Sequence, residues 1–168
     1  MTKGRRQTLF CLTLWSVLAP PAWSGDLDLD SVKGVYRHRF ENGDVEGRKF
    51  PGEDILEIVP LSPKTAYFRL HLDFFNGHLC SLWGVADAVE SGLLYRADAC
   101  RFTVRFDESQ VTLLDEGGRC REEACGARGS IDGATFENGS RRAIRYLDRI
   151  LASRQYKEAL AARDNRQP

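Results

Sequence analysis

Residues 65–75 (TAYFRLHLDFF) alternate in polarity with a period of two, and this pattern restricts the fold more than any other feature of the chain. One face is apolar and the other is mainly polar: the first carries Ala66, Phe68, Leu70, Leu72 and Phe74, and the second carries Tyr67, Arg69, His71 and Asp73. Side chains of a β-strand point alternately to opposite faces, so the pattern predicts a strand with one buried face. Asn76-Gly77 follows, and it is the dipeptide that a two-residue type I′ hairpin requires, because both positions need positive φ.

The same alternation recurs between turn signals, and it predicts the fold class. Residues 100–106 (CRFTVRF) place a cysteine, two phenylalanines and a valine on one face, and residues 107–109 then form another tight turn. We expect a mainly β protein. It should be an antiparallel meander of about seven or eight strands, closing as a small barrel or packing as a sandwich.

The C-terminal part changes to a helical period. Its apolar positions share one helical face, and they are Ala143, Leu147, Ile150 and Leu151. The pattern predicts a helix over about residues 140–163 that packs on the β part. Asn138 or Ser140 is the expected N-cap, and Ser153 is expected to cap a second, short helical segment.

Residues 1–24 have the layout of a secretory signal peptide. Three basic residues precede an apolar run (LFCLTLWSVL) that is too short to span a bilayer, and small residues follow at the cleavage positions. We therefore expect a single disulfide-bonded β domain over residues 25–168, located in the periplasm or secreted. No later segment is apolar enough to cross a membrane, so we expect no integral membrane segment after signal cleavage.

The charge of the predicted mature chain disfavours two classes of partner. Three of the 24 basic residues and none of the 24 acidic residues lie in 1–24, so the mature chain has 21 basic residues, 24 acidic residues and a formal net charge of −3. A mildly acidic domain without a basic block is a poor nucleic-acid binder, and it is not attracted to an anionic membrane. A basic protein partner would suit it better.

Four cysteines remain after signal cleavage: Cys80, Cys100, Cys120 and Cys125. An even number in an exported chain predicts two disulfides. If Cys80 faces Cys100 across an antiparallel pair of strands, the hairpin tip falls at residues 88–92. That argument favours the pairs 80–100 and 120–125. The other pairings, which join Cys80 to one of the two later cysteines, would staple more distant strands.

The sequence offers little catalytic or metal-binding chemistry. It contains neither a Gly-x-Ser-x-Gly elbow nor a His-Glu-x-x-His motif. Cys120 and Cys125 have a spacing that zinc sites use, but the chain lacks a second close pair. His38 and His71 are expected to be surface residues of strands, and His78 follows a hairpin turn. We expect a protein that is not an enzyme and holds no metal or cofactor.

The segment SGLLY, residues 91–95, suggests a function. It fits the pattern Ser-Gly-x-x-Tyr, which resembles the inhibitory loop of bacterial periplasmic lysozyme inhibitors, a family of small exported β-proteins that are often disulfide-bonded. In that family the loop enters the lysozyme cleft. The resemblance implies that Ser91 is the inserted hydroxyl, Gly92 the permissive backbone and Tyr95 the supporting phenol beside the catalytic carboxylates. The partner would be a cell-wall hydrolase.

Two other interpretations of the same region stay open. The protein could be an immunity protein that blocks an injected cell-wall amidase, and the turn formed by Asp107, Glu108, Ser109 and Gln110 would then serve as well as the Ser-Gly turn. Alternatively, the Ser-Gly pair is an ordinary turn, and Leu93 and Tyr95 belong to the core.

A third class of function is a small β-barrel that carries an apolar ligand. Exported meander barrels can hold such a ligand in their mouth. In this chain Phe74, Phe75, Trp83 and Tyr95 are the aromatic residues that could line that cavity, although alternation also allows them to be core residues.

Overall fold

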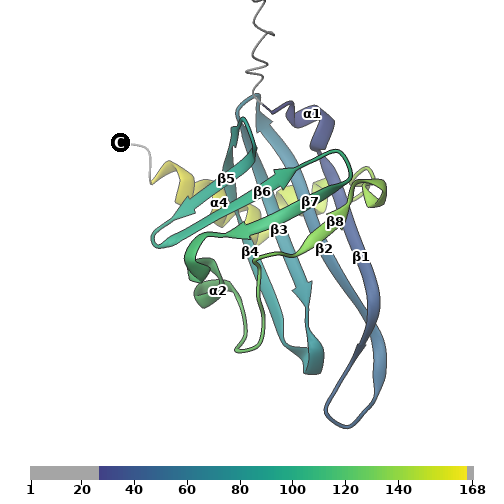
Figure 1. The fold of residues 1–168 in the computed structure, drawn as a ribbon. Helices are drawn as coiled ribbons and strands as arrows, with labels where there is room; N and C mark the ends of the chain where they lie inside the picture. Colours follow the sequence, from purple (N-terminus) through teal and green to yellow (C-terminus); the bar gives the residue numbers. More distant parts are fainter. Residues whose placement is uncertain (1–26, 166–168) are drawn as a thin grey trace, which may run out of the picture.

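A computed structural model of the chain describes residues 27–165, which form one antiparallel sheet of eight strands in meander order (Figure 1). The strands are β1 Gly34–Gly43, β2 Lys49–Ser62, β3 Thr65–Asp73, β4 Leu79–Val89, β5 Gly92–Ala97, β6 Cys100–Phe106, β7 Gln110–Asp115 and β8 Thr135–Glu137. The helices are α1 Leu29–Val32, α2 Arg119–Ala124, α3 Leu147–Ala152 and α4 Arg154–Asp164, with 3-10 turns at Phe75–Gly77, Glu116–Gly118 and Asn138–Ser140. The predicted signal peptide, residues 1–24, lies outside the described residues.

The sheet curls into a nearly closed barrel, which confirms the predicted meander and decides between a barrel and a sandwich. The first strand contacts the last, and just beyond β8 the chain bonds to β1. There the N–H of Val35 donates to the carbonyl of Arg142 at 2.8 Å, and the N–H of Arg142 donates back at 2.9 Å. Closure of this kind satisfies the backbone groups that open sheet edges leave unpaired.

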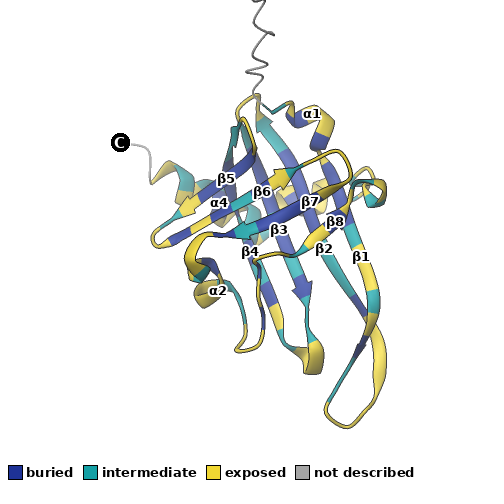
Figure 2. Ribbon diagram, in the orientation of Figure 1, coloured by how far each residue is buried: buried dark blue, intermediate teal, exposed yellow. Residues whose placement is uncertain are grey.

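Side chains fill the interior of the barrel. Inward residues of successive strands form one apolar cluster, whose fully buried members include Tyr36, Leu56, Phe68, Leu70, Phe102, Leu113 and Phe136. The ring of Phe68 lies 5.1 Å from that of Tyr95 and 5.4 Å from that of Phe102, measured between centroids. Figure 2 shows these buried stretches along the strands. The interior is therefore a packed core.

A second apolar cluster lies outside the barrel, between the sheet and the C-terminal helices. Val59, Tyr67 and Val85 come from β2, β3 and β4, and they meet Ile150 of α3 and Ala159 of α4. These three strands are thus buried on both faces, which explains why their sequences are more continuously apolar than a half-exposed strand requires.

The C-terminal helical part starts later than predicted. We expected it from about residue 140, capped by Asn138 or Ser140, but α3 begins only at Leu147, because the chain first runs extended beside β1. The prediction for Ser153 is confirmed: its hydroxyl caps α4 by accepting a hydrogen bond from the backbone N–H three residues later, at 3.2 Å. The prediction failed where a backbone bridge replaced the expected first helical turns.

Tyr67 should make the stability of the protein fall at alkaline pH. Burial of its side chain raises its pKa from the ordinary tyrosine value of 10.0 to about 12. The unfolded chain therefore loses this proton first, so the stabilisation is complete below about pH 10 and is lost as the pH rises towards 12. We expect the free energy of unfolding to fall by about 2–3 kcal/mol over this range. Denaturant titrations should show a clearly smaller fall in Tyr67→Phe; an equal fall in both proteins would contradict the assignment.

The disulfide pairing differs from the prediction. The structure joins Cys80 to Cys125 and Cys100 to Cys120, rather than 80 to 100 and 120 to 125. The prediction assumed that Cys80 and Cys100 face each other across one hairpin. However, the chain turns again at Asp98, whose φ is 44°, so that Cys100 opens β6, which pairs with β5 and β7. The bridges fasten α2 and the residue after it to the starts of β4 and β6, and they are consistent with an oxidising compartment.

Candidate functional site

The Ser-Gly turn lies where the sequence placed it, at the tip of the β4–β5 hairpin. Glu90 and Ser91 form its two exposed turn residues. Successive turns of a meander alternate between the two ends of the barrel, so this turn shares the α1 end with the β2–β3 and β6–β7 turns (Figure 1). The disulfides brace the other end. The tip is held instead by the N–H of Ala88, which donates to the carbonyl of Lys64 in the β2–β3 turn at 2.8 Å.

Gly92 is required by the hairpin itself. Its φ is +148°, a conformation that glycine adopts far more easily than any other residue. A Cβ added at this position would also overlap the backbone carbonyl of Val104 on β6. The glycine thus allows β5 to lie close against β6, directly behind the exposed Ser91.

The remaining residues of SGLLY point into the barrel wall and core. Both leucines are buried, and Tyr95 is only 9% exposed. The Tyr95 ring packs edge-on against Phe68 and lies over Gly84, where an added Cβ would overlap it. The predicted inhibitory set is therefore divided: Ser91 is accessible to a partner, whereas Tyr95 is a core residue and cannot supply the supporting phenol without leaving the core.

The alternative loop, the β6–β7 turn, is fixed by its own aspartate. The Oδ1 atom of Asp107 accepts hydrogen bonds from the N–H groups of Gln110 at 2.9 Å and Ser109 at 3.0 Å, which hold the pKa of Asp107 below its ordinary value. The side-chain amide of Asn138 also donates to the Asp107 carbonyl, at 2.8 Å. Asp107 and Ser109 are thus committed to the turn, and the exposed side chains that it offers are those of Glu108 and Gln110.

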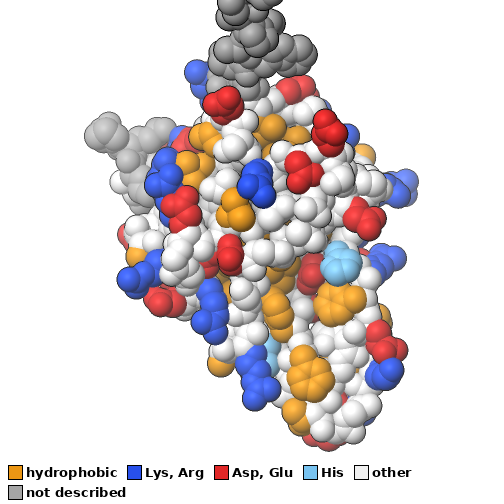
Figure 3. Space-filling view, viewed as in Figure 1, with side chains coloured by type: hydrophobic (Ala, Val, Ile, Leu, Met, Phe, Trp, Pro, Cys, Tyr) orange, Lys and Arg blue, Asp and Glu red, His pale blue; other side chains and the backbone are white. Residues whose placement is uncertain are grey.

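The aromatic residues proposed to line a ligand cavity do not converge. Trp83 packs in the cluster outside the barrel, whereas Tyr95 lies in the interior core. Phe74 is half-buried against the core, and Phe75 is 50% exposed in the β3–β4 turn. Figure 3 shows hydrophobic side chains on the lower part of one face, away from α1. Phe74 and Tyr95 belong to the interior core, whereas Trp83 lies outside the barrel and Phe75 is exposed, so the four rings do not line one cavity.

The histidines of the strands lie beside carboxylates. His71 Nε2 is 2.9 Å from Asp73 Oδ1, and His38 Nδ1 is 3.5 Å from Asp54 Oδ2. Burial raises the pKa of Asp54. Within residues 27–165 no group of three or more His, Cys, Asp or Glu side chains is arranged to hold a metal ion.

A polar cluster on the outer wall of the barrel was missed by the sequence analysis. Glu57 on β2 is 2% exposed, and both of its oxygens accept hydrogen bonds from Arg69 on β3, one of them at 2.9 Å. The Tyr146 hydroxyl also donates to Glu57, at 2.6 Å; burial and this bond raise the pKa of Tyr146. Arg37 reaches the same hydroxyl at 3.5 Å and forms an ion pair with Glu53 at 2.6 Å.

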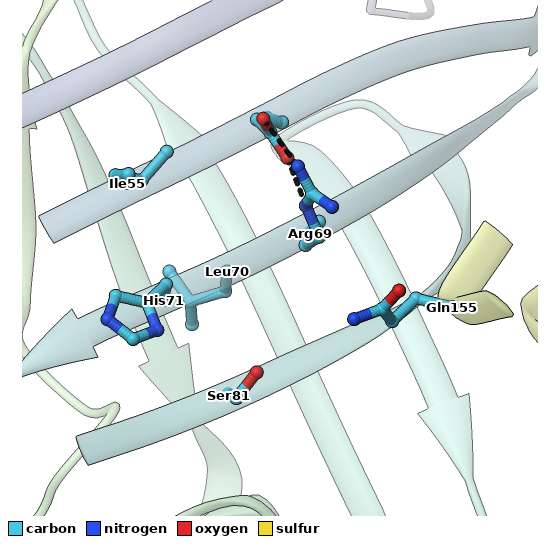
Figure 4. Close-up of a pocket in the computed structure, with 7 residues that line it drawn as sticks. Ile55, Arg69, Leu70, His71, Ser81 and Gln155 are labelled. Atoms are coloured by element: carbon cyan, nitrogen blue, oxygen red, sulfur yellow. Dashed lines mark hydrogen bonds and ion pairs between the residues drawn. The ribbon is translucent and has the colours of Figure 1, made fainter. Parts of the chain in front are cut away.

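Two hollows flank the Glu57–Arg69 pair, and together they form a surface that we call the outer groove. The smaller has a volume of about 250 Å³ and is lined by Ile55, Glu57, Arg69, Leu70, His71, Ser81 and Gln155 (Figure 4). The larger has a volume of about 430 Å³ and is lined by Arg37, Ile55, Glu57, Arg69, Tyr146, Arg149 and Ile150. The groove thus runs over β1–β4 and is bordered by α3 and the start of α4.

The sequence did contain a signal for this cluster. Residues 54–61 (DILEIVPL) form a nearly continuous apolar run, which is typical of a strand buried on both faces. A glutamate inside such a run requires a buried partner, because an unpaired buried charge is very unfavourable. Hairpin register places Glu57 opposite Arg69, but Tyr146 lies 89 residues away, and its contact depends on the tertiary fold.

In the part of the chain that the structure describes, none of the helices combines the length and apolar character needed to cross a membrane.

Comparisons with known proteins assign no family to this chain. No protein-family model matches the sequence, and no curated protein or solved structure matches it either.

Proposed function

We propose that this protein is an exported, non-enzymatic binding protein that inhibits a peptidoglycan hydrolase, either a lysozyme or an injected amidase. The Ser91 turn would enter the active-site cleft of the target. The observation that carries the proposal is the exposure of Ser91 at the very tip of a hairpin whose following residues are anchored in the core.

The construction of the hairpin supports a binding role. Gly92 lies against β6, the SGLLY leucines are buried, and Ala88 is bonded to the neighbouring turn. An ion pair between Arg163 of α4 and Asp87 of β4, at 2.7 Å, adds a further support just below the tip. A loop that is already ordered loses less conformational entropy when it binds, so more of its contact energy contributes to affinity.

The chemistry of the tip suits a cleft that contains carboxyl groups. A lysozyme-type site presents a carboxylic acid and a carboxylate in a groove, and one serine hydroxyl can donate to the second and accept from the first. Because Tyr95 is in the core, Glu90 is the other side chain that the tip offers. The three turns at this end of the barrel expose three carboxylates, Glu90, Asp107 and Glu108, against one lysine, Lys64, and this balance favours a target with positive charge around its cleft.

Ser91→Ala tests this proposal. Loss of a hydrogen bond to a charged group should weaken inhibition roughly ten- to a hundredfold. The melting temperature should hardly move, because the hydroxyl is exposed and surface substitutions usually change stability by less than about 0.5 kcal/mol. The measurement is the inhibition of c-type, g-type and i-type lysozymes and of a peptidoglycan amidase by each purified protein.

Ser130→Ala is the matched control, since Ser130 is an exposed serine in the loop between α2 and β8, away from the Ser-Gly turn. It should inhibit as well as the unaltered chain. If the unaltered chain inhibits none of these enzymes, the proposal is wrong. If it inhibits and Ser91→Ala inhibits equally well, a different loop makes the contact, and Glu108→Ala becomes the decisive variant.

A further inference from the structure

The outer groove has hydrogen-bonding groups that the fold itself does not use. The Nε and Nη2 atoms of Arg69 donate hydrogen bonds to Glu57, whereas its Nη1 atom forms no hydrogen bond with any residue in the range 27–165. The same holds for the side chains of Ser81 and Gln155, both of which are partly accessible. In Figure 4 the Gln155 amide and the Ser81 hydroxyl extend towards the space beside the Arg69 guanidinium. The smaller hollow is thus bordered by several groups that can bind a polar molecule.

The larger hollow has an excess of positive charge. Three arginines line it, Arg37, Arg69 and Arg149, and two carboxylates compensate them, Glu53 for the first and Glu57 for the second. Within the described residues no carboxylate lies at ion-pair distance from Arg149. Its guanidinium carbon lies 5.3 Å from the centroid of the Tyr146 ring. One positive charge therefore remains uncompensated at the edge of this hollow.

Arginine is well suited to oxyanions, because its planar guanidinium can donate two parallel hydrogen bonds to a carboxylate. Arg69 and Tyr146 occupy three acceptor positions of the nearly buried Glu57 carboxylate, so Glu57 has at most one lone pair left for a ligand donor. The wall between the hollows is thus fixed, and the groups that remain available are mainly donors. The larger hollow, at about 430 Å³, lies within the range for small-ligand sites, about 300–1,000 Å³, and the smaller hollow, at about 250 Å³, lies just below that range.

We infer that the outer groove binds a small, singly charged carboxylate with an uncharged amide- or hydroxyl-bearing body, such as the C-terminal end of a short peptide. Its carboxylate lies in the larger hollow against Arg149 and Arg37. Its polar body passes Arg69 and receives hydrogen bonds from Gln155 and Ser81. This site is separate from the Ser91 turn, on the outer wall rather than at the α1 end, and does not depend on the function proposed for that turn.

The test is a titration of the isotope-labelled protein followed by backbone and side-chain amide NMR signals. The probes are N-acetyl-dialanine with a free carboxylate, the same compound with a C-terminal amide, acetate, and inorganic phosphate. We expect saturable shifts around β3, β4 and Gln155 with the free carboxylate, and a Kd on the order of 1 mM, as a few exposed hydrogen bonds and one ion pair provide. The amide-capped compound should bind at least about tenfold more weakly.

Arg149→Gln should weaken binding of the free carboxylate roughly tenfold, whereas Arg145→Gln, which removes an exposed arginine that does not line the groove, should leave it unchanged. Gln155→Ala should weaken binding of N-acetyl-dialanine while leaving that of acetate unaltered. The inference is overturned if the free and capped compounds bind equally, if phosphate alone binds, if no probe gives saturable shifts, or if Arg145→Gln is as defective as Arg149→Gln.

Discussion

Replacing Arg69 with alanine is expected to lower the free energy of unfolding by about 3 kcal/mol. The substitution leaves the Glu57 carboxylate almost fully buried and without its cationic partner. Breaking a buried ion pair usually costs about 3–5 kcal/mol, and the lower end applies because the Tyr146 hydroxyl still donates to Glu57. Denaturant unfolding of the two proteins at neutral pH measures the difference.

Two further variants show whether the loss comes from the stranded charge. The double substitution Glu57→Leu and Arg69→Met replaces the pair with apolar groups, and it should recover most of the stability. Arg39→Ala removes a largely exposed partner of Glu53, so it should cost less than about 1 kcal/mol. If Arg69→Ala lowers the free energy of unfolding no more than Arg39→Ala does, the Glu57–Arg69 pair does not stabilise the barrel wall in the way its geometry indicates.

The fold could be predicted largely because its determinants are local. The alternation at residues 65–75 and 100–106 fixed strands and their inward faces, and the helical cap at Ser153 was visible as a short side chain before an amphipathic segment. Asn76 and Gly77 have positive φ, as predicted, but the turn also includes Phe75 and is therefore one residue longer than the predicted two-residue hairpin. Local patterns did not predict the extended path of the chain before Leu147. A backbone bridge to β1, a strand distant in sequence, produces this path.

The pairing of the cysteines and the candidate sites depended on contacts between distant segments. The prediction placed Cys100 on the strand that follows the Ser-Gly turn. The chain turns at Asp98 before it reaches Cys100, and no glycine or proline follows Asp98 to indicate this turn in the sequence. Likewise, Ser91 and Tyr95 belong to one sequence motif, SGLLY, but in the folded hairpin Ser91 is exposed to solvent and Tyr95 is buried in the core. The motif could identify the turn, whereas only the packing of the strands could show which of its side chains a partner can reach.

Gly92→Val should be the most damaging single change in the hairpin, with a loss of about 4 kcal/mol or more in the free energy of unfolding. Two costs combine. A β-branched residue is strained at a φ of +148°, and its Cβ would overlap the Val104 carbonyl, a backbone atom that cannot move without separating β5 from β6. The expected result is a large fall in the denaturant midpoint, or failure to accumulate as folded protein.

Gly47→Val separates these two costs. Gly47 has a φ of +79° in the β1–β2 turn, and an added Cβ there would have no atom within 4 Å, so only backbone strain of about 1–3 kcal/mol applies. If the two valine variants lose equal stability, the close approach of β5 to β6 is not the constraint that the structure indicates. Weaker inhibition by Gly92→Val would reflect a disordered hairpin, because this variant also loses stability. Weaker inhibition by a fully stable Ser91→Ala would instead place the contact at the tip itself.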